Sequence, residues 1–351
     1  MVPSSEAGIS HPVDLASLLR KVTGGVDLSL LEAEGLFGTF MSGEAGDARM
    51  AAFLAALRTK GASPSEVAGG VRALRGAMVP VPARDRDSLV DTAGTGGGSV
   101  TTFNISTAAA LTAAGAGVRL AKHGNRSFTS RCGSADVLEV LGVRIDLTPE
   151  RMGEVLEEVG IVFMFAPLLH PAMRHVGPVR RALGITTIMN LLGPLTNPAG
   201  ARRQVIGVAD PELLPLAARS MEQLGHLAAW VVHGSPGIDE LSPGGATRVA
   251  ELVDGTVREY EVTPESFGQE ALPLDGLAGG EPEENAALIR KLLAGGGPPV
   301  ARSAVVMNAA AAIYVAGGAD SLRHAAERAE ASLDEGAAGR ALEALAETSN
   351  A

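Results

Sequence analysis

The stretch DTAGTGGGSVTTFNIST, from Asp91 to Thr107, decides the fold that this sequence predicts. It follows a short apolar run ending at Leu89 and Val90, and it leads into the alanine-rich segment 108–114, which favours a helix. Glycines allow backbone N–H groups to converge on an anion without Cβ clashes. A helix start adds unpaired N–H donors and the positive end of a dipole. A strand, a glycine loop and a helix start in this order predict a phosphate-binding turn.

This glycine loop differs from the common nucleotide-binding motifs. A Walker loop requires a lysine after its last glycine, and the segment 91–107 contains none. A dinucleotide-binding loop requires a third glycine where Ser99 or Thr101 stands, depending on the glycine at which the motif begins. Tight packing of a strand against a helix would also explain the glycines, so the loop alone leaves a purely structural role open.

A second polar cluster, KHGNRSFTSRCGSAD from Lys122 to Asp136, follows the apolar segment 117–121. Lys122 and His123 therefore come at the end of an expected strand, where open α/β sheets bind ligands. Three cations and several hydroxyl groups within a short loop suit a polyanion. A solvated basic loop would explain Lys122 and Arg126 singly, but it explains less well why they follow a second strand.

Two further clusters add candidate ligands. The adjacent carboxylates Asp239 and Glu240 follow the strand-like segment 228–234, and Mg²⁺ prefers carboxylate and phosphate oxygens. Such a pair is more often a solvated turn, and the two phosphate-type loops make it a metal candidate here. Apolar, His and Arg residues in Phe163–Arg181 and Asn190–Pro198 could surround a flat aromatic acid, because arginine offers a carboxylate two parallel hydrogen bonds.

Together these clusters resemble the anthranilate phosphoribosyltransferase family, enzymes of tryptophan synthesis. The family motifs Thr-Phe-Asn-Ile-Ser-Thr, Lys-His-Gly-Asn-Arg-Ser, Gly-Ser-Ala-Asp, His-Pro-Ala-Met, Pro-Val-Arg, Asn-Leu-Leu-Gly-Pro-Leu-Thr-Asn-Pro and Asp-Glu occur here in order. Gly98 departs from the family pattern, which has aspartate after Gly-Thr-Gly-Gly. Segment 186–190 reads Thr-Thr-Ile-Met-Asn instead of the usual Arg-Thr-x-Phe-Asn, and Cys132 replaces a small serine.

The resemblance implies an α/β fold with a small all-helical domain and a larger α/β domain, whose central mixed sheet is flanked by helices. The helical domain is expected at residues 12–82, with a returning segment at about 171–196. The α/β domain, which binds phosphoribosyl pyrophosphate, is expected at residues 83–170 and 197–351. The active site would lie in the cleft between them.

The resemblance also implies the reaction, which transfers 5-phosphoribose from phosphoribosyl pyrophosphate to the amine of anthranilate and releases pyrophosphate. No residue is expected to act as a general acid or base, and Lys122 and His123 are the candidates for a catalytic role. Mg²⁺ is the expected cofactor, and its expected ligands are Ser106, Asp239 and Glu240.

The substrate contacts that the resemblance implies lie in the same clusters. Anthranilate is expected to contact Gly94, Asn125, His170 and Arg180. The contacts expected for phosphoribosyl pyrophosphate are Gly94, Gly97, Gly98, Thr102, Asn104, Ile105, Ser106, Thr107, Lys122, His123, Gly124, Asn125, Arg126, Ser127, Phe128, Thr129, Ser130 and Ser134.

Three alternatives remain open. A pyrimidine nucleoside phosphorylase would share the architecture, but its lysine loop lacks His-Gly-Asn-Arg. A non-catalytic paralogue that binds nucleic acid or a protein partner is suggested by Gly98. An altered aromatic acceptor is suggested by Thr186 and Met189.

Composition narrows the class of protein. The chain has 351 residues, of which 46% are hydrophobic and only 3% aromatic, so Ala, Val and Leu must build a sizeable core. The net charge of −11 argues against broad nucleic-acid binding. A single Cys fits a reducing compartment, and neither a signal peptide nor a long apolar run is apparent, so we expect a cytoplasmic protein. The resemblance implies a homodimer.

Periodicity predicts the order of the elements. The segment from Asp14 to about Met78 has apolar residues at helical spacing, and Ser63 and Glu66 form a capping box at the start of one helix. Further helices are expected at 281–293, 301–317 and 319–348. Expected strands are Leu89–Asp91, Val118–Ala121, Ile161–Phe165, Gln204–Val208, Ala228–His233 and Arg248–Leu252.

Overall fold

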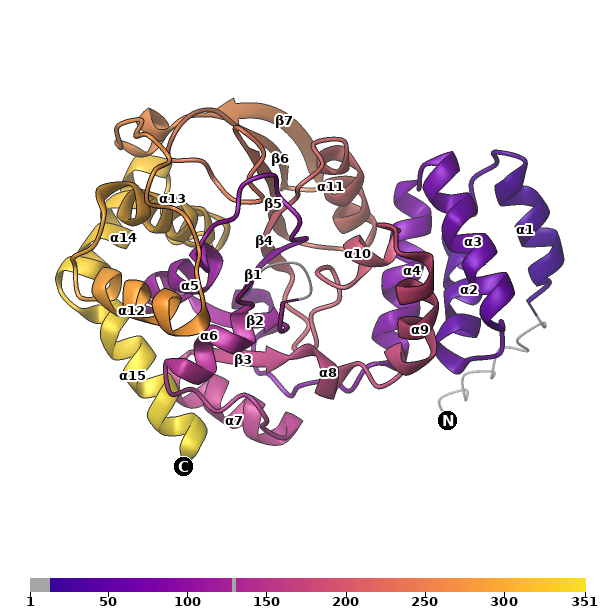
Figure 1. Ribbon diagram of the computed structural model, residues 1–351, viewed down its shortest axis with the longest axis horizontal. Coiled ribbons are helices and arrows are strands. Elements are labelled where there is room, and N and C mark those ends of the chain that lie inside the picture. The colour runs from indigo at the N-terminus through magenta and orange to yellow at the C-terminus, as the bar shows by residue number, and fades with distance from the viewer. Residues whose placement is uncertain (1–12, 128–130) are drawn as a thin grey trace, which may run out of the picture.

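The computed structural model describes residues 13–127 and 131–351. The described chain forms two lobes, a smaller helical one and a larger one built around a sheet (Figure 1). This arrangement confirms the predicted fold class. The expected phosphate contacts Phe128, Thr129 and Ser130 lie outside the described residues.

The smaller lobe contains α1 (Leu15–Thr23), α2 (Leu30–Ser42), α3 (Asp47–Lys60), α4 (Pro64–Ala77), α9 (Met173–Leu183) and α10 (Met189–Leu192). Capping boxes start α2 and α4, the second of them being the one predicted at Ser63 and Glu66. Although it comes much later in the chain, α9 packs against α2 and α3, and α10 packs against α4. Val176 and Val179 of α9 share a buried core with the N-terminal helices. The exact division into domains stays a prediction.

The sheet runs in the order β3-β2-β1-β4-β5-β6-β7. The first five strands in this order are parallel, and β6 and β7 are antiparallel to their neighbours. All six expected strands are present, and the third has its predicted bounds. The strands are β1 (Leu89–Gly94), β2 (Arg119–Gly124), β3 (Ile161–Phe165), β4 (Arg203–Gly207), β5 (Ala228–Gly234), β6 (Thr247–Val253) and β7 (Thr256–Val262).

The strand β7 is missing from the sequence prediction for a physical reason. It lies at the edge of the sheet, and most of its side chains are exposed. Arg258, Glu259 and Glu261 interrupt its apolar alternation, so no buried face appears in the sequence. Its register comes from pairing with β6, which sequence periodicity cannot report.

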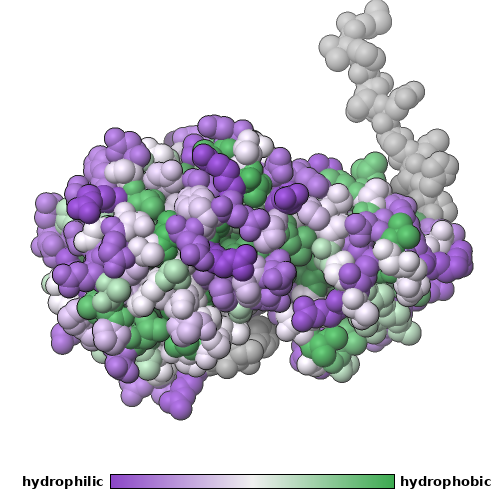
Figure 2. All heavy atoms as spheres, turned by 90° about the horizontal axis from the view of Figure 1, so that it is seen from above, coloured by the Kyte–Doolittle hydropathy of each residue, from purple (hydrophilic) through white to green (hydrophobic). Residues whose placement is uncertain are grey.

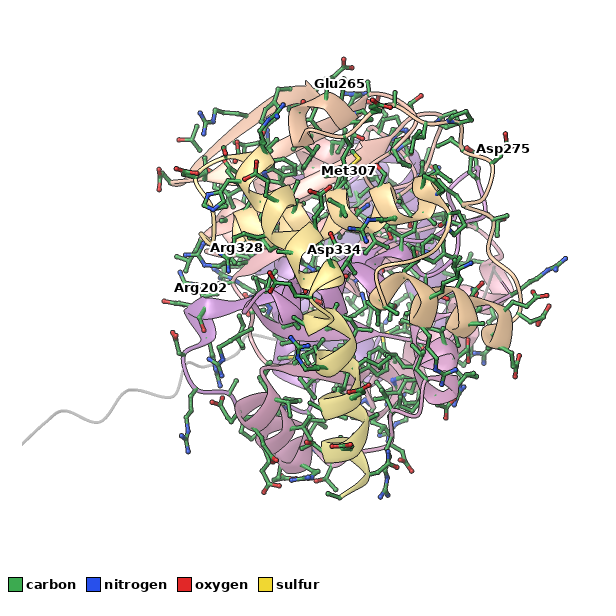
Figure 3. The ribbon with its side chains drawn as sticks, turned by 90° about the vertical axis from the view of Figure 1, so that its left-hand side faces the viewer. Arg202, Glu265, Asp275, Met307, Arg328 and Asp334 are labelled. Carbon is green, nitrogen blue, oxygen red and sulfur yellow. The ribbon has the colours of Figure 1, made fainter. Side chains whose placement is uncertain are left out.

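Helices cover both faces of the sheet. Val205 and Trp230 face the core that includes α5 and α13, whereas Ile206 and Val231 face the core that includes α11 and the helical lobe. Figure 3 views the layer of C-terminal helices from outside, with Met307 on α13 and Arg328 and Asp334 on α14. The helices of this lobe are α5 (Ile105–Gly115), α6 (Ser134–Val140), α7 (Pro149–Val159), α8 (Ala166–Leu169), α11 (Leu213–Gln223), α12 (Pro282–Leu293), α13 (Pro299–Val315), α14 (Leu322–Asp334) and α15 (Ala337–Asn350), with short 3₁₀ turns at Arg86–Ser88 and Pro264–Phe267.

The expected helical segment 319–348 is divided into α14 and α15. The break falls at Gly336, whose φ of +71° lies in the left-handed region that ends helices. Seen from above, hydrophilic side chains cover most of the surface, with hydrophobic ones scattered between them (Figure 2). None of the described helices is long and apolar enough to cross a membrane.

The two capping boxes provide a matched test of burial. Glu66 is fully buried and bonds to Lys60 at 2.9 Å and to the backbone N–H groups of Leu28 and Ser63, whereas Glu32 pairs with Lys21 at 34% exposure. We expect Glu66→Ala to lower the free energy of unfolding by about 2–4 kcal/mol, because it leaves the backbone N–H groups of Leu28 and Ser63 unpaired and removes one of the two carboxylates that bind Lys60. Glu32→Ala should lower it by about 1 kcal/mol. Urea unfolding measures both, and equal losses would contradict the burial argument.

Candidate active site

The site begins at the point where the strand order reverses. β1 lies between β2 and β4, so the chain passes from β1 through β2 to β3 on one side and then returns to add β4 on the other. In open α/β sheets, ligands bind outside the carboxyl ends of strands at such a point. The glycine loop after β1 and the Lys122 end of β2 both lie there, as the sequence predicts.

The loop that carries Asp239 closes onto the glycine loop. Gly96 N–H donates to Asp239 Oδ2 at 2.9 Å, and Ser99 N–H donates to Gly237 C=O at 2.9 Å. A Cβ on Gly94 would lie 2.8 Å from Asp239 Oδ2, and one on Gly207 would lie 1.5 Å from the Asp239 carbonyl oxygen. The absence of side chains at these strand ends therefore allows the acidic loop to reach the reversal point.

Glu240 bonds to the start of α5. Ser106 N–H donates to Glu240 Oε1 at 3.1 Å, so a carboxylate occupies one of the unpaired donors of the helix start. Burial, together with the neighbouring Asp239 charge, raises the pKa of Glu240 to about 8, and burial also raises the pKa of Asp239. Two adjacent carboxylates that resist ionisation in isolation are a favourable place for a cation.

Lys122 lies almost fully buried, at 4% exposure, between β1 and α5. Its Nζ donates to Thr92 C=O at 2.5 Å, to Thr92 Oγ1 at 3.2 Å and to Ser106 Oγ at 3.3 Å. Burial lowers the pKa of Lys122, whereas the charges of Asp91 and Glu240 oppose this effect. The ammonium therefore lies at the helix start, where a phosphate group would be bound.

His123 and His170 form a pair that the sequence does not predict. Their Nε2 atoms are 3.1 Å apart. Burial lowers the pKa of His123 to about 3 and that of His170 to about 4, so both rings are neutral near pH 7. In a hydrogen bond between two neutral rings, one Nε2 must donate and the other must accept, which fixes opposite tautomers.

Other predicted contacts have varied surroundings. Arg180 is half-buried, its guanidinium forms no hydrogen bond or ion pair with another described residue, and burial lowers its pKa. Arg126 is instead held by Asp136 at 2.8 Å and Glu139 at 2.5 Å. The Asn125 carbonyl accepts bonds from the Ser134 hydroxyl and the Ala135 N–H.

The remaining predicted phosphate contacts are held to different degrees. Asn104 Nδ2 donates to Cys132 C=O at 3.2 Å, and its Oδ1 accepts a bond from Asn285 Nδ2 at 3.0 Å. Thr102 forms a bridge with Ala278. Ile105 and Thr107 are buried, Gly124 and Ser127 are partly buried in the lysine loop, and Gly97 has a φ of +81°.

Sequence reasoning missed several buried polar residues around this site. Asp91, Asn197 and Gln204 are at most 3% exposed, and they bond to one another or to neighbouring strands. The available signal was a polar residue within an otherwise apolar strand, as in Leu89-Val90-Asp91. A buried polar group of this kind requires a partner, so it marks a specific contact.

A cavity of about 570 Å³ adjoins the other side of the glycine loop. Gly96, Gly97 and Arg58 line it, together with Thr186 and Ile188 from the segment before α10. It therefore lies between the lobes, and its lining does not include Lys122, His170 or Arg180. Only part of the expected site borders this cavity.

Family comparisons agree with this architecture. Residues 16–78 match the helical bundle domain of a glycosyl transferase family, and residues 86–339 match the a/b domain of the same family. The anthranilate phosphoribosyltransferase of Rubrobacter xylanophilus is 50% identical over 94% of this chain and 96% of its own length. That of Symbiobacterium thermophilum is 48% identical over 95% and 97%. The chain belongs to the anthranilate phosphoribosyltransferase family.

Solved structures of the family have the same fold. The anthranilate phosphoribosyltransferase of Thermus thermophilus is 46% identical and superposes with a TM-score of 0.90, covering 95% of this chain and 99% of that one. The Saccharomyces cerevisiae enzyme in complex with PRPP and Mg is 27% identical, with a TM-score of 0.86 over 96% and 98% of the two chains. The family resemblance drawn from the motifs is therefore confirmed.

The close approach at Gly207 can be tested by adding one methyl group. We expect Gly207→Ala to displace the Asp239 backbone and to lower phosphoribosyltransferase activity by about 100-fold, because a shift of about 1 Å in a site has an effect of this size. Gly38→Ala is the control, since a Cβ there meets nothing within 4 Å. Steady-state kinetics of both variants measure the effect, and a fully active Gly207→Ala enzyme would contradict it.

Proposed function

We propose that this chain transfers 5-phosphoribose from phosphoribosyl pyrophosphate to the amine of anthranilate, with release of pyrophosphate. The observation that carries the proposal is the convergence of the glycine loop, the α5 start, the Lys122 ammonium and the Asp239–Glu240 pair at the reversal point of the sheet. The names of the relatives and the motif order support the same reaction.

The donor atoms fit Mg²⁺. Asp239, Glu240 and the Ser106 hydroxyl offer oxygen atoms only, and among the described residues no group of three His, Cys, Asp or Glu side chains offers a complete cage. Mg²⁺ is usually bound by one or two carboxylates, water and substrate phosphates, which matches two carboxylates beside a phosphate loop. Bound there, it would help to neutralise the charge of the leaving pyrophosphate.

The chain itself would stabilise the leaving group in two ways. Backbone N–H groups of Gly97 and Gly98 would bind phosphate oxygens at the positive end of the α5 dipole, and the Lys122 ammonium would balance their charge. The carboxylates Asp91 and Glu240 favour the charged form of Lys122 without touching it. The anomeric carbon loses the pyrophosphate oxygen and gains the anthranilate nitrogen, which then releases a proton.

The acceptor needs little acid–base assistance, since the amine of anthranilate is a neutral nucleophile. Positioning is therefore the main requirement. Arg180 is a cation without a described partner and would bind the carboxylate of anthranilate. Asn125 and His170 would contact the same molecule.

A cytoplasmic homodimer completes the proposal. A single cysteine suits a reducing compartment. Leu31 and Val26 of the helical lobe are 75% and 52% exposed, and a second subunit that covered them would remove this apolar surface from water. Light scattering of the purified chain would measure the oligomeric state, and a monomer would refute the dimer.

The decisive experiment is detection of N-phosphoribosyl anthranilate by mass spectrometry after incubation with phosphoribosyl pyrophosphate, Mg²⁺ and anthranilate. Loss of anthranilate fluorescence gives the rate. Product formed only from another aromatic acid would identify an altered acceptor. Phosphate-dependent cleavage of a pyrimidine nucleoside, or salt-dependent DNA binding without turnover, would refute the proposal.

Removing the acidic pair should abolish the metal-dependent reaction. We expect Asp239→Asn with Glu240→Gln to lower kcat/KM by about 100-fold or more, because the cation loses its carboxylate ligands. The thermal midpoint should stay near that of the wild type, since both substitutions keep the side-chain shape. The exposed pair Glu259 and Glu261, changed to glutamines, is the control. Full turnover of the first double variant at ordinary Mg²⁺ would remove these residues from the site.

Arg180 should act on one substrate only. Arg180→Ala is expected to lower kcat/KM for anthranilate by about 10- to 150-fold, the effect of losing a charged hydrogen bond of about 1.5–3 kcal/mol. The corresponding value for phosphoribosyl pyrophosphate should change much less. Arg181→Ala, an exposed neighbour on α9, is the control. Equal losses for both substrates would contradict an acceptor role.

Gly98 tests the departure from the family pattern. Its φ lies outside the left-handed region, unlike that of Gly96, so the backbone conformation accepts a side chain. A Cβ there would lie 3.0 Å from the Gly237 carbonyl oxygen, so the neighbouring loop must shift slightly, and 3.3 Å from Asp239 Oδ1. We expect Gly98→Asp to lower the half-saturating Mg²⁺ concentration about fivefold, since a nearby extra charge contributes about 1 kcal/mol. Gly98→Asn, of equal size, should not. Identical Mg²⁺ titrations of the aspartate variant and the wild type would contradict the expectation.

A further inference from the structure

The parallel ladder between β1 and β2 stops partway along both strands. Leu89 pairs with Arg119 and Val90 pairs with Leu120, and beyond these pairs β1 continues to pair only with β4 while β2 continues to pair only with β3. The two central strands therefore separate at their carboxyl ends, where the proposed site lies.

Side chains occupy backbone groups along this separation. We call the three residues that provide them, Asp91, Lys122 and Asn197, the split-strand clasp. Their bonds run from His123 N–H to Asp91 Oδ1 at 3.1 Å, from Asn197 Nδ2 to Ala121 C=O at 2.8 Å, and from Lys122 Nζ to Thr92 C=O at 2.5 Å. The clasp thus satisfies polar groups that would otherwise be left unpaired in the core.

Asp91 is the least expected member of the clasp. It is 0% exposed, and its second oxygen lies 3.4 Å from Gln204 Nε2 on β4. Burial raises the pKa of Asp91 to about 6, and a bond from Asn197 and the charge of Lys122 oppose this rise. A continuous ladder would pair backbone groups without burying a carboxyl group, so the separation has a consequence other than stability.

That consequence is the position of the lysine side chain. Because the strands are apart, the Lys122 ammonium lies against the Thr92 carbonyl and 3.3 Å from Ser106 Oγ at the start of α5. We propose that Asp91 is a positioning residue, which accepts the His123 N–H in place of the ladder and so holds Lys122 where the pyrophosphate group binds. The proposal deepens the proposed function and rests on it for the identity of the anion.

The test compares Asp91→Asn with Glu66→Gln, a second fully buried carboxylate that accepts backbone N–H bonds but lies in the helical lobe. In Asp91→Asn, an amide that keeps its oxygen on the His123 N–H points its own N–H groups at the amide groups of Gln204 and Asn197, which also donate. We expect this clash between donors to open the clasp. We expect Asp91→Asn to lower kcat/KM for phosphoribosyl pyrophosphate by about 10- to 100-fold, as a small misplacement does, with KM for anthranilate unchanged. Glu66→Gln should leave both values near those of the wild type.

Two readouts do not depend on turnover. Calorimetry with inorganic pyrophosphate and Mg²⁺ should record weaker binding to Asp91→Asn, and hydrogen exchange should become faster in the peptide that contains β2. Neither should change in Glu66→Gln. Wild-type pyrophosphate affinity together with wild-type exchange of β2 in Asp91→Asn would overturn the proposal, as would equal losses in both variants.

Asn197→Ala provides a second route if Asp91→Asn does not fold. It removes the bonds that Asn197 makes to Ala121 C=O and to Asp91, and those that it accepts from Ala199 and Ala201 N–H, while the Asp91 carboxylate itself is kept. We expect the same weakening for pyrophosphate and the same faster exchange in β2, and wild-type values would overturn the clasp. If the wild-type protein forms no product, the proposed function fails, whereas pyrophosphate binding and exchange still decide the role of Asp91.

Discussion

The arrangement of the site in the larger lobe depends on the burial of one ammonium group, that of Lys122. Among the described residues, the Lys122 ammonium donates hydrogen bonds only to oxygen atoms of Thr92 and Ser106, and no carboxylate forms an ion pair with it. Burial disfavours its charge, so Asp91 and Glu240 must balance it from a distance. Glu240 in turn resists ionisation because it is buried and Asp239 lies beside it. Without a ligand, the Lys122 ammonium lacks an anion in direct contact and the Asp239–Glu240 pair lacks a cation. A phosphate anion that binds together with a divalent cation would provide both.

Space is the second constraint, and glycine provides it. The acidic loop that follows β5 reaches the reversal point only because Gly94 and Gly207 have no side chains. The Asp239 carbonyl occupies the position of a Cβ on Gly207, and the Asp239 carboxylate accepts the Gly96 N–H. The carboxylates and the phosphate loop are far apart in the chain, and these glycines allow them to lie together in the fold. The same two glycines therefore satisfy the packing of the loop and place the carboxylates of the site.

Local patterns in the sequence were enough to predict the elements and the groups at their ends. The strand before the glycine loop, the capping box at Ser63 and the place of Lys122 at the end of β2 all depend on neighbouring residues. The features that the sequence does not predict depend on how the strands are aligned with one another. The separation of β1 from β2, and the insertion of the Asp91 carboxylate into it, involve partners on three strands and a distant loop. The His123–His170 contact likewise joins two segments through folding alone.

Two of the departures from the family pattern, Gly98 and Thr186, lie on the two sides of the glycine loop. A side chain at Gly98 would face Asp239, whereas Thr186 lines the cavity on the side of Gly96 and Gly97. Neither departure touches the clasp or the Lys122 ammonium. A backbone loop binds phosphate mainly through N–H groups, which survive a change of side chain. A buried ammonium between separated strands has no such substitute, because its position depends on every side chain that holds the strands apart.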